Sequence, residues 1–120
     1  MIVVINRFIP FKGYTAMAVY PFVFVRKEFE SYQHSEEWKR MILHEKIHFA
    51  QQKELLLITF YFIYFLDFLF QLLIHKNVSK AYRLICFEQE AYQNEKNKSY
   101  LSTRKRFSWR KYFQYYRKRV

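Results

Sequence analysis

The stretch from Ser35 to His48, SEEWKRMILHEKIH, is the part of the chain from which the fold is best derived. Ser35 is a favourable N-cap residue, and the two acidic residues after it suit the first turn of a helix. Further along, one face repeats at three- and four-residue spacing. This face is made of Met41, His44, Ile47, His48 and Gln51. The pattern predicts a helix from Glu36 to the mid-fifties.

The histidines on this helix have the spacing of metal ligands. His44 and His48 are four residues apart, so a helix presents both imidazoles on one face, where they can bind one Zn²⁺ ion. Glu45 follows on the same helix and can take a proton from a water that the metal has already acidified. The motif predicts a zinc site with Glu45 as general base. The alternative is a chance pair of histidines on a polar helix face.

A catalytic zinc ion needs a third protein ligand and an open coordination position. The segment FEQEAY, residues 87–92, lies on a later predicted helix. Here the chain resembles the gluzincins, a family of HExxH zincin metallopeptidases whose third ligand is a Glu on a later helix. The resemblance implies that Glu88 is this ligand, and Glu90 on the same helix is the alternative.

Some integral-membrane zincins, such as the CaaX prenyl proteases and the β-lactam-sensor peptidases, have Glu-x-x-Ala-Asp or a close variant at this place. Ala91 matches the small residue, and Tyr92 stands where the family has Asp. That Asp orients a ligand histidine, so either the Tyr92 hydroxyl takes this role or another residue does. The whole pattern, HExxH with a downstream ExEAY segment, also resembles small bacterial proteins of unassigned function. The activity implied is hydrolysis of peptide bonds by zinc-activated water.

The rest of the chain predicts a mainly helical α+β fold. Two β-rich stretches, residues 2–9 and 14–25, flank the turn-forming tetrapeptide PFKG and predict an N-terminal β-hairpin. Pro21 marks the second strand as an edge strand or bends it. No Gly or Pro follows, which favours long helices, and one is expected from a cap at Asn77 or Ser79 to about Asn97. We expect one domain over residues 1–120, with a hairpin at 1–30, a helical zinc-site core at 36–98 and a basic, aromatic tail at 99–120.

The most apolar stretch, Leu55–Ile74, has the length of a membrane span. A single span would place His48 and Glu88 on opposite sides of about 30 Å of hydrocarbon, so they could not bind one ion. A straight helix through this stretch also fails, because its end would lie about 39 Å from His48. The zinc hypothesis therefore predicts a bend near Thr59, in a helix that is buried in the core or lies in a membrane interface.

The formal net charge of +11 is concentrated towards the C-terminal end. Residues 96–120 hold ten Lys or Arg and no acidic residue, interleaved with aromatic residues. Three interpretations stay open: aromatics packed on the core with the charges in water, contact with an anionic membrane, and, third, contact with nucleic acid. The alternative to a peptidase is therefore a non-catalytic basic protein that binds a membrane surface or nucleic acid through this tail.

Four further residues are expected to have structural roles or to lie at the surface. His34 and His75 stand alone in the sequence, so each is expected at the surface. Asp67 is expected to cap a helix end or to pair with a Lys or Arg. The single cysteine, Cys86, excludes an intramolecular disulfide and suits helix packing.

The first residues lack the pattern of a signal peptide. We expect a cytoplasmic protein that acts on a peptide or protein substrate, and peripheral contact with the inner face of the membrane stays open.

Overall fold

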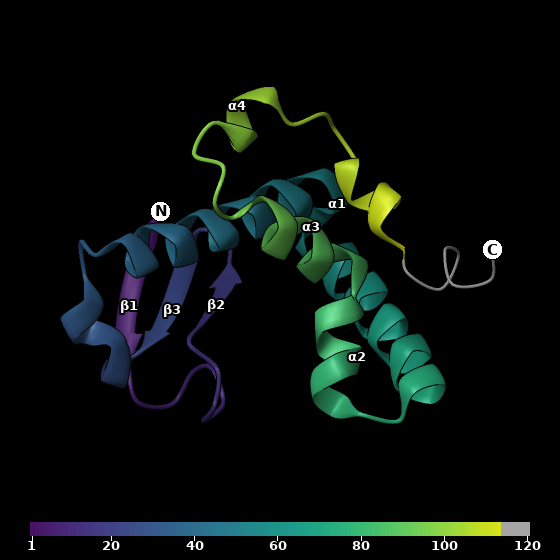
Figure 1. Ribbon diagram of the computed structural model, residues 1–120, viewed down its shortest axis with the longest axis horizontal. Helices are drawn as coiled ribbons and strands as arrows, with labels where there is room; N and C mark the ends of the chain where they lie inside the picture. The colour runs from purple at the N-terminus through teal and green to yellow at the C-terminus, as the bar shows by residue number, and fades with distance from the viewer. Residues whose placement is uncertain (114–120) are drawn as a thin grey trace.

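The computed structural model describes residues 1–113 of the chain. A small sheet lies at one end and helices make up most of the rest, so the predicted α+β, mainly α-helical class is confirmed (Figure 1). The strands are β1 (Ile2–Asn6), β2 (Ala16–Val19) and β3 (Phe22–Arg26). The helical elements are the 3₁₀ helix η1 (Lys27–Tyr32), α1 (Glu36–His75), α2 (Val78–Leu84), α3 (Cys86–Asn94), α4 (Tyr100–Thr103) and the 3₁₀ helix η2 (Ser108–Tyr112).

The sheet has the order β1-β3-β2, and this corrects the predicted strand pairing. β1 pairs with β3 in parallel, and only β2 and β3 form an antiparallel hairpin. The hairpin therefore lies within the second β-rich stretch and does not join the two stretches. Pro21 lies in its turn, where no N–H has to be donated to a neighbouring strand. β3 becomes the central strand, and its Val23 and Val25 are fully buried.

Helix α1 begins as the sequence predicts and bends where the zinc hypothesis needs it to. The Ser35 hydroxyl accepts a hydrogen bond of 3.1 Å from the Trp38 N–H. Leu56, with φ 58° and ψ 150°, interrupts the helical geometry three residues before the expected position at Thr59. The first half of α1 lies against the sheet, and the second half runs beside α2 (Figure 1).

The single helix expected after residue 77 is two helices, because Ile85 leaves helical geometry at φ −55° and ψ 133°. Asn77 is the cap of α2, accepting a bond of 2.9 Å from the Lys80 N–H. The Asp67 carboxylate accepts a bond of 2.7 Å from the Cys86 N–H, so it caps α3 from α1. This is one of the two roles expected for Asp67. The break lets α3 turn back towards the first half of α1.

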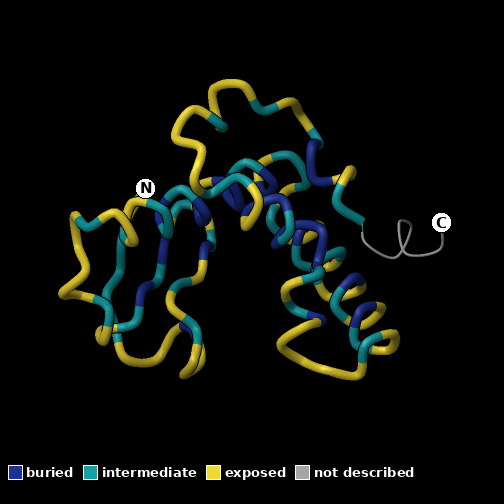
Figure 2. The backbone as a smooth tube through the Cα atoms, viewed as in Figure 1, coloured by how far each residue is buried: buried dark blue, intermediate teal, exposed yellow. Residues whose placement is uncertain are grey.

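Two groups of buried apolar residues form the core, and Figure 2 shows them along the sheet, α1 and α3. One joins β3 and β2 to the first half of α1. The other joins the second half of α1 to α3 and η2 and includes Phe60, Ile85, Cys86, Phe87 and Trp109. Burial of Cys86 agrees with its expected packing role. Within the described residues α1 alone is long and apolar enough to cross a membrane, judged by length and composition.

The described part of the basic tail forms α4 and η2, and η2 packs on the core. Trp109 is buried, and Phe107 and Tyr112 pack beside it. Of the three interpretations of the tail, packing of its aromatic residues on the core is present among the described residues. The remaining tail residues, Gln114 to Val120 with Tyr115, Tyr116, Arg117, Lys118 and Arg119 among them, lie outside the described residues.

Candidate metal centre

Three side chains with metal-ligating atoms converge between α1 and α3. Glu88 Oε1 lies 3.0 Å from His44 Nε2 and 3.1 Å from His48 Nε2. All three residues are buried, and their three ligand atoms lie within 4.8 Å of one another. The helix bend at Leu56 and the break at Ile85 bring these distant segments together. The group could hold a metal ion.

The distances in this group fit a small divalent ion. Metal–ligand bonds of about 2.0–2.2 Å place neighbouring ligands of a tetrahedral site about 3.3–3.6 Å apart. The two contacts of Glu88 Oε1 are a few tenths of an ångström shorter than that spacing. Two imidazoles and one carboxylate suit first-row divalent ions. Three protein ligands also leave a fourth position open, as catalytic sites require.

The other ring nitrogen of each histidine has its own partner. Nδ1 of His44 lies 2.7 Å from Glu95 Oε1, and Nδ1 of His48 lies 2.7 Å from Gln51 Oε1. A carboxylate or amide oxygen only accepts, so each Nδ1–H donates to it. These contacts orient the rings with Nε2 towards Glu88, the arrangement typical of metal-bound histidines.

Charge in the cluster is balanced between the imidazoles and the carboxylates. Burial alone would lower the pKa of His44, but Glu88 and Glu95 raise it to about 10. The pKa of His48 is also raised, with Glu88 outweighing the effect of burial. Burial opposes ionisation of Glu88, yet the two histidines hold its pKa below its usual range. A bound divalent cation would take the place of protons on the imidazoles, so metal uptake should release protons.

Glu45 lies beside this group. It is buried and lines the same cleft as His48 and Glu88. Burial raises the pKa of its carboxyl, against the effect of the neighbouring histidines and the Ala18 backbone. A carboxylate with a raised pKa is better matched to proton transfer near neutral pH.

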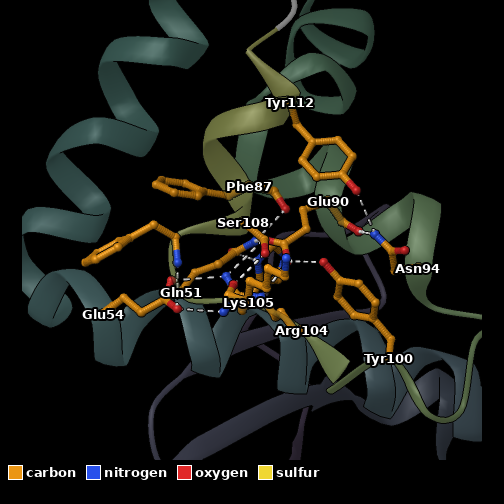
Figure 3. A network of polar contacts seen from close by, with 12 residues as sticks. Gln51, Glu54, Phe87, Glu90, Asn94, Tyr100, Arg104, Lys105, Ser108 and Tyr112 are labelled. Atoms are coloured by element: carbon orange, nitrogen blue, oxygen red, sulfur yellow. Dashed lines mark hydrogen bonds and ion pairs between the residues drawn. The ribbon is translucent and has the colours of Figure 1, made fainter. Parts of the chain in front are cut away.

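Glu90, the alternative third ligand, belongs to a different network (Figure 3). Its side chain is fully buried and accepts bonds of 2.5 Å from Tyr100 Oη, 2.5 Å from Arg104 Nε and 2.9 Å from Gln51 Nε2. Arg104 also pairs with Glu54 at 2.7 Å. The structure thus brings Glu88 to the histidines and uses Glu90 to hold Gln51, which in turn contacts His48.

Several residues at the site were missed by sequence reasoning. Tyr64 Oη donates a bond of 2.5 Å to Glu88 Oε2, which leaves Oε1 directed at the imidazoles. Glu95 is seven residues after Glu88, two helical turns on, so helical spacing could have indicated it. Tyr64 and Arg104 have no such signal, because their partners are distant in sequence. Tyr92 meets His44 through its ring, with the ring centroids 4.6 Å apart.

The two isolated histidines lie away from the metal-type group. His34 is exposed, in the turn before α1, as expected. His75 is partly exposed at the end of α1. Neither belongs to the group of ligand atoms found among the described residues.

A largely apolar cleft of about 490 Å³ leads to the cluster. Glu45, His48 and Glu88 lie in its wall. Its apolar lining comes from the β1–β2 loop, β2, the second half of α1 and α2. These residues are Pro10, Phe11, Tyr14, Ala16, Met17, Ala18, Phe60, Tyr61, Tyr64, Phe65, Phe68, Val78 and Tyr82.

The free edge of β2 forms one side of this cleft. Arg26 N–H donates to Thr15 C=O across the ladder, so by alternation the peptide groups of Ala16 and Ala18 point away from β3. The Ala18 carbonyl accepts bonds of 2.8 Å from both Gln52 Nε2 and Tyr61 Oη. The N–H and C=O of Ala16 are directed to the cleft side, where an extended chain could pair with them.

Comparisons of the sequence and structure with protein-family models, with curated proteins and with solved structures found no match.

Proposed function

We propose that this protein is a minimal zinc-dependent peptidase. His44, His48 and Glu88 would hold the zinc ion, and Glu45 would be the general base. The observation that carries the proposal is the convergence of the three ligand atoms within 4.8 Å, next to a buried Glu45 and at a cleft. These features support metal-assisted hydrolysis of a peptide, which needs three ligands, a base and access for the substrate.

A bound zinc ion would acidify a water molecule and polarise the substrate carbonyl. The protein residues have distinct tasks around that chemistry. Glu45 accepts the proton of the attacking water and returns it to the leaving amine. Gln51 and Glu95 hold the two imidazoles in the orientation that presents Nε2. Tyr64 occupies one oxygen of Glu88 and leaves the other for the metal.

The cleft supports a peptide or protein as substrate. An extended segment can add to the edge of β2 through the peptide groups of Ala16, in the manner of β-strand addition. The aromatic residues opposite this edge would surround one large apolar side chain of the substrate. Peptides with such a residue next to the cleaved bond should therefore be cut faster than peptides with charged residues there.

The test is metal analysis of protein purified without added metal, combined with cleavage of a peptide library. About one equivalent of zinc is expected, and His44→Ala and His48→Ala should lose it. His34→Ala removes an exposed histidine and is the matched control, which should keep the metal. Glu45→Gln should keep the metal and lose cleavage. Zinc content near zero that His44→Ala leaves unchanged would refute the proposal.

A further inference from the structure

Two segments project on the same side of the molecule and flank the mouth of the cleft. One is the loop between β1 and β2, and the other is the junction of α1 and α2, both at the lower edge of Figure 1. Phe11 from the first and Val78 from the second line the cleft together. We call residues 7–13 and 73–80 the rim.

The tips of the rim are apolar and exposed. Phe8 and Phe11 are 84% and 82% exposed, and Leu73 is 76% exposed. Ile9, Ile74 and Val78 add to the same edge. Single exposed apolar residues are common in proteins, but several of them gathered around the mouth of one cleft mark a surface that binds something. The outward face of α1 continues it with Phe62, Phe65, Leu66 and Leu69.

The charge of the rim is of one sign. Its ionised residues are Arg7, Lys12, Lys76 and Lys80, all exposed, and neither segment contains an acidic residue. Arg83, one helical turn further along α2, is also exposed. Aromatic and aliphatic tips surrounded by cations suit an anionic lipid surface, where the tips enter the headgroup region and the cations meet phosphates. An acidic protein would account for the cations but not for the apolar tips on two opposing loops.

We propose that an anionic membrane surface covers the rim, so that the mouth of the cleft faces the bilayer. Binding uses the tips and cations of the rim and needs neither the metal nor the proposed peptidase activity. The consequence for that activity is that a substrate would enter from the membrane surface, as a lipid-anchored or membrane-bordering peptide segment does.

The first test measures co-sedimentation with vesicles of phosphatidylcholine and phosphatidylglycerol in equal parts, and of phosphatidylcholine alone. The protein should bind the anionic vesicles more strongly, and salt should weaken the binding. Phe8→Ser combined with Phe11→Ser should lower the partition coefficient at least about tenfold. Leu73→Ser should also lower it. Leu56→Ser is the matched control, since Leu56 is 74% exposed on the same helix and lies about 25 Å away along it.

The second test separates the rim from the overall positive charge. Two double variants each remove two positive charges. One is Lys76→Gln with Lys80→Gln, in the rim, and the other is Lys96→Gln with Lys98→Gln, distant from it. The rim pair should lower the partition coefficient onto anionic vesicles about thirtyfold, and the distant pair should lower it much less. Equal losses, a greater loss for the distant pair, or no effect of Phe8→Ser with Phe11→Ser would overturn the proposal. Glu45→Gln and chelator-treated protein should bind normally, so failure of the peptidase proposal is recognised separately.

Discussion

Arg104→Met should cost this protein a large part of its stability. The Arg104 side chain is 5% exposed and pairs with Glu54 at 2.7 Å and Glu90 at 2.5 Å, which are themselves 9% and 0% exposed. Methionine keeps the apolar stem of the side chain and removes both ion pairs. Two buried carboxylates then remain without their cation, and Glu54 also accepts a bond from the Phe107 N–H.

The size of the loss follows from the burial of the pair. Removing one partner of a buried ion pair costs about 3–5 kcal/mol, whereas an exposed pair contributes about 0–1 kcal/mol. A stranded carboxylate can instead bind a proton, and at pH 7 this costs an ordinary glutamate about 3.7 kcal/mol. We therefore expect a loss of about 3–5 kcal/mol, most of it at the fully buried Glu90. This is a large share of the roughly 5–15 kcal/mol that a domain of this size has.

The assay is urea unfolding at pH 7, followed by circular dichroism. Lys39→Met is the control, because Lys39 pairs with Glu36 at 3.6 Å on the surface, where the two side chains are 58% and 70% exposed. It should change the free energy of unfolding by less than about 1 kcal/mol. Adding Glu90→Gln to Arg104→Met should restore part of the loss, since it removes the stranded charge. A loss below about 1 kcal/mol for Arg104→Met, or no recovery in the double variant, would refute the reasoning.

Three further predictions concern the site and the bend. Gln51→Leu removes the acceptor of the His48 Nδ1–H and should weaken zinc binding about 10–100-fold, measured by competition with a chromophoric chelator. The folded-state pKa of His44 is raised to about 10, so protonation of this imidazole stabilises the metal-free protein. The free energy of unfolding should therefore fall as pH rises from about 6.5 through 10, measured by urea unfolding with chelator present. Leu56→Gly should stabilise by about 1 kcal/mol by relieving the left-handed backbone, whereas Leu73→Gly, in regular helix, should destabilise by a similar amount in the same assay.

Local chemistry explains which elements could be predicted. The cap at Ser35 and the helix after it depend on neighbouring residues, and the structure has both. The bend could be anticipated because two ligands of one ion had to meet, although nothing in the sequence places it at Leu56. A leucine there is unfavourable by itself, and packing of the two halves of α1 on separate cores outweighs this cost.

Long-range pairing explains what could not be predicted. The turn at Pro21 accounts for the β2–β3 hairpin. It does not decide which strand pairs with the other edge of β3, and in the structure this strand is β1, in parallel. No Gly or Pro in the sequence marks the break at Ile85, and the Asp67 carboxylate that caps the next helix lies 19 residues earlier in the chain. Tyr64 reaches Glu88 across 24 residues, a contact that no spacing rule indicates.

The position of Arg104 also has a consequence for biosynthesis. Its two carboxylate partners lie 50 and 14 residues earlier in the chain, and the ribosome makes a protein from its N-terminus. A nascent chain that has both histidines and Glu88 still lacks the cation that compensates Glu54 and Glu90. η2, which packs against the helix with Glu88 in the folded protein, is also made after that helix. If the proposed site binds zinc, a stable metal centre would therefore form only after Arg104 and η2 have been made, and a chain that ends before residue 104 would have every ligand and no stable metal centre.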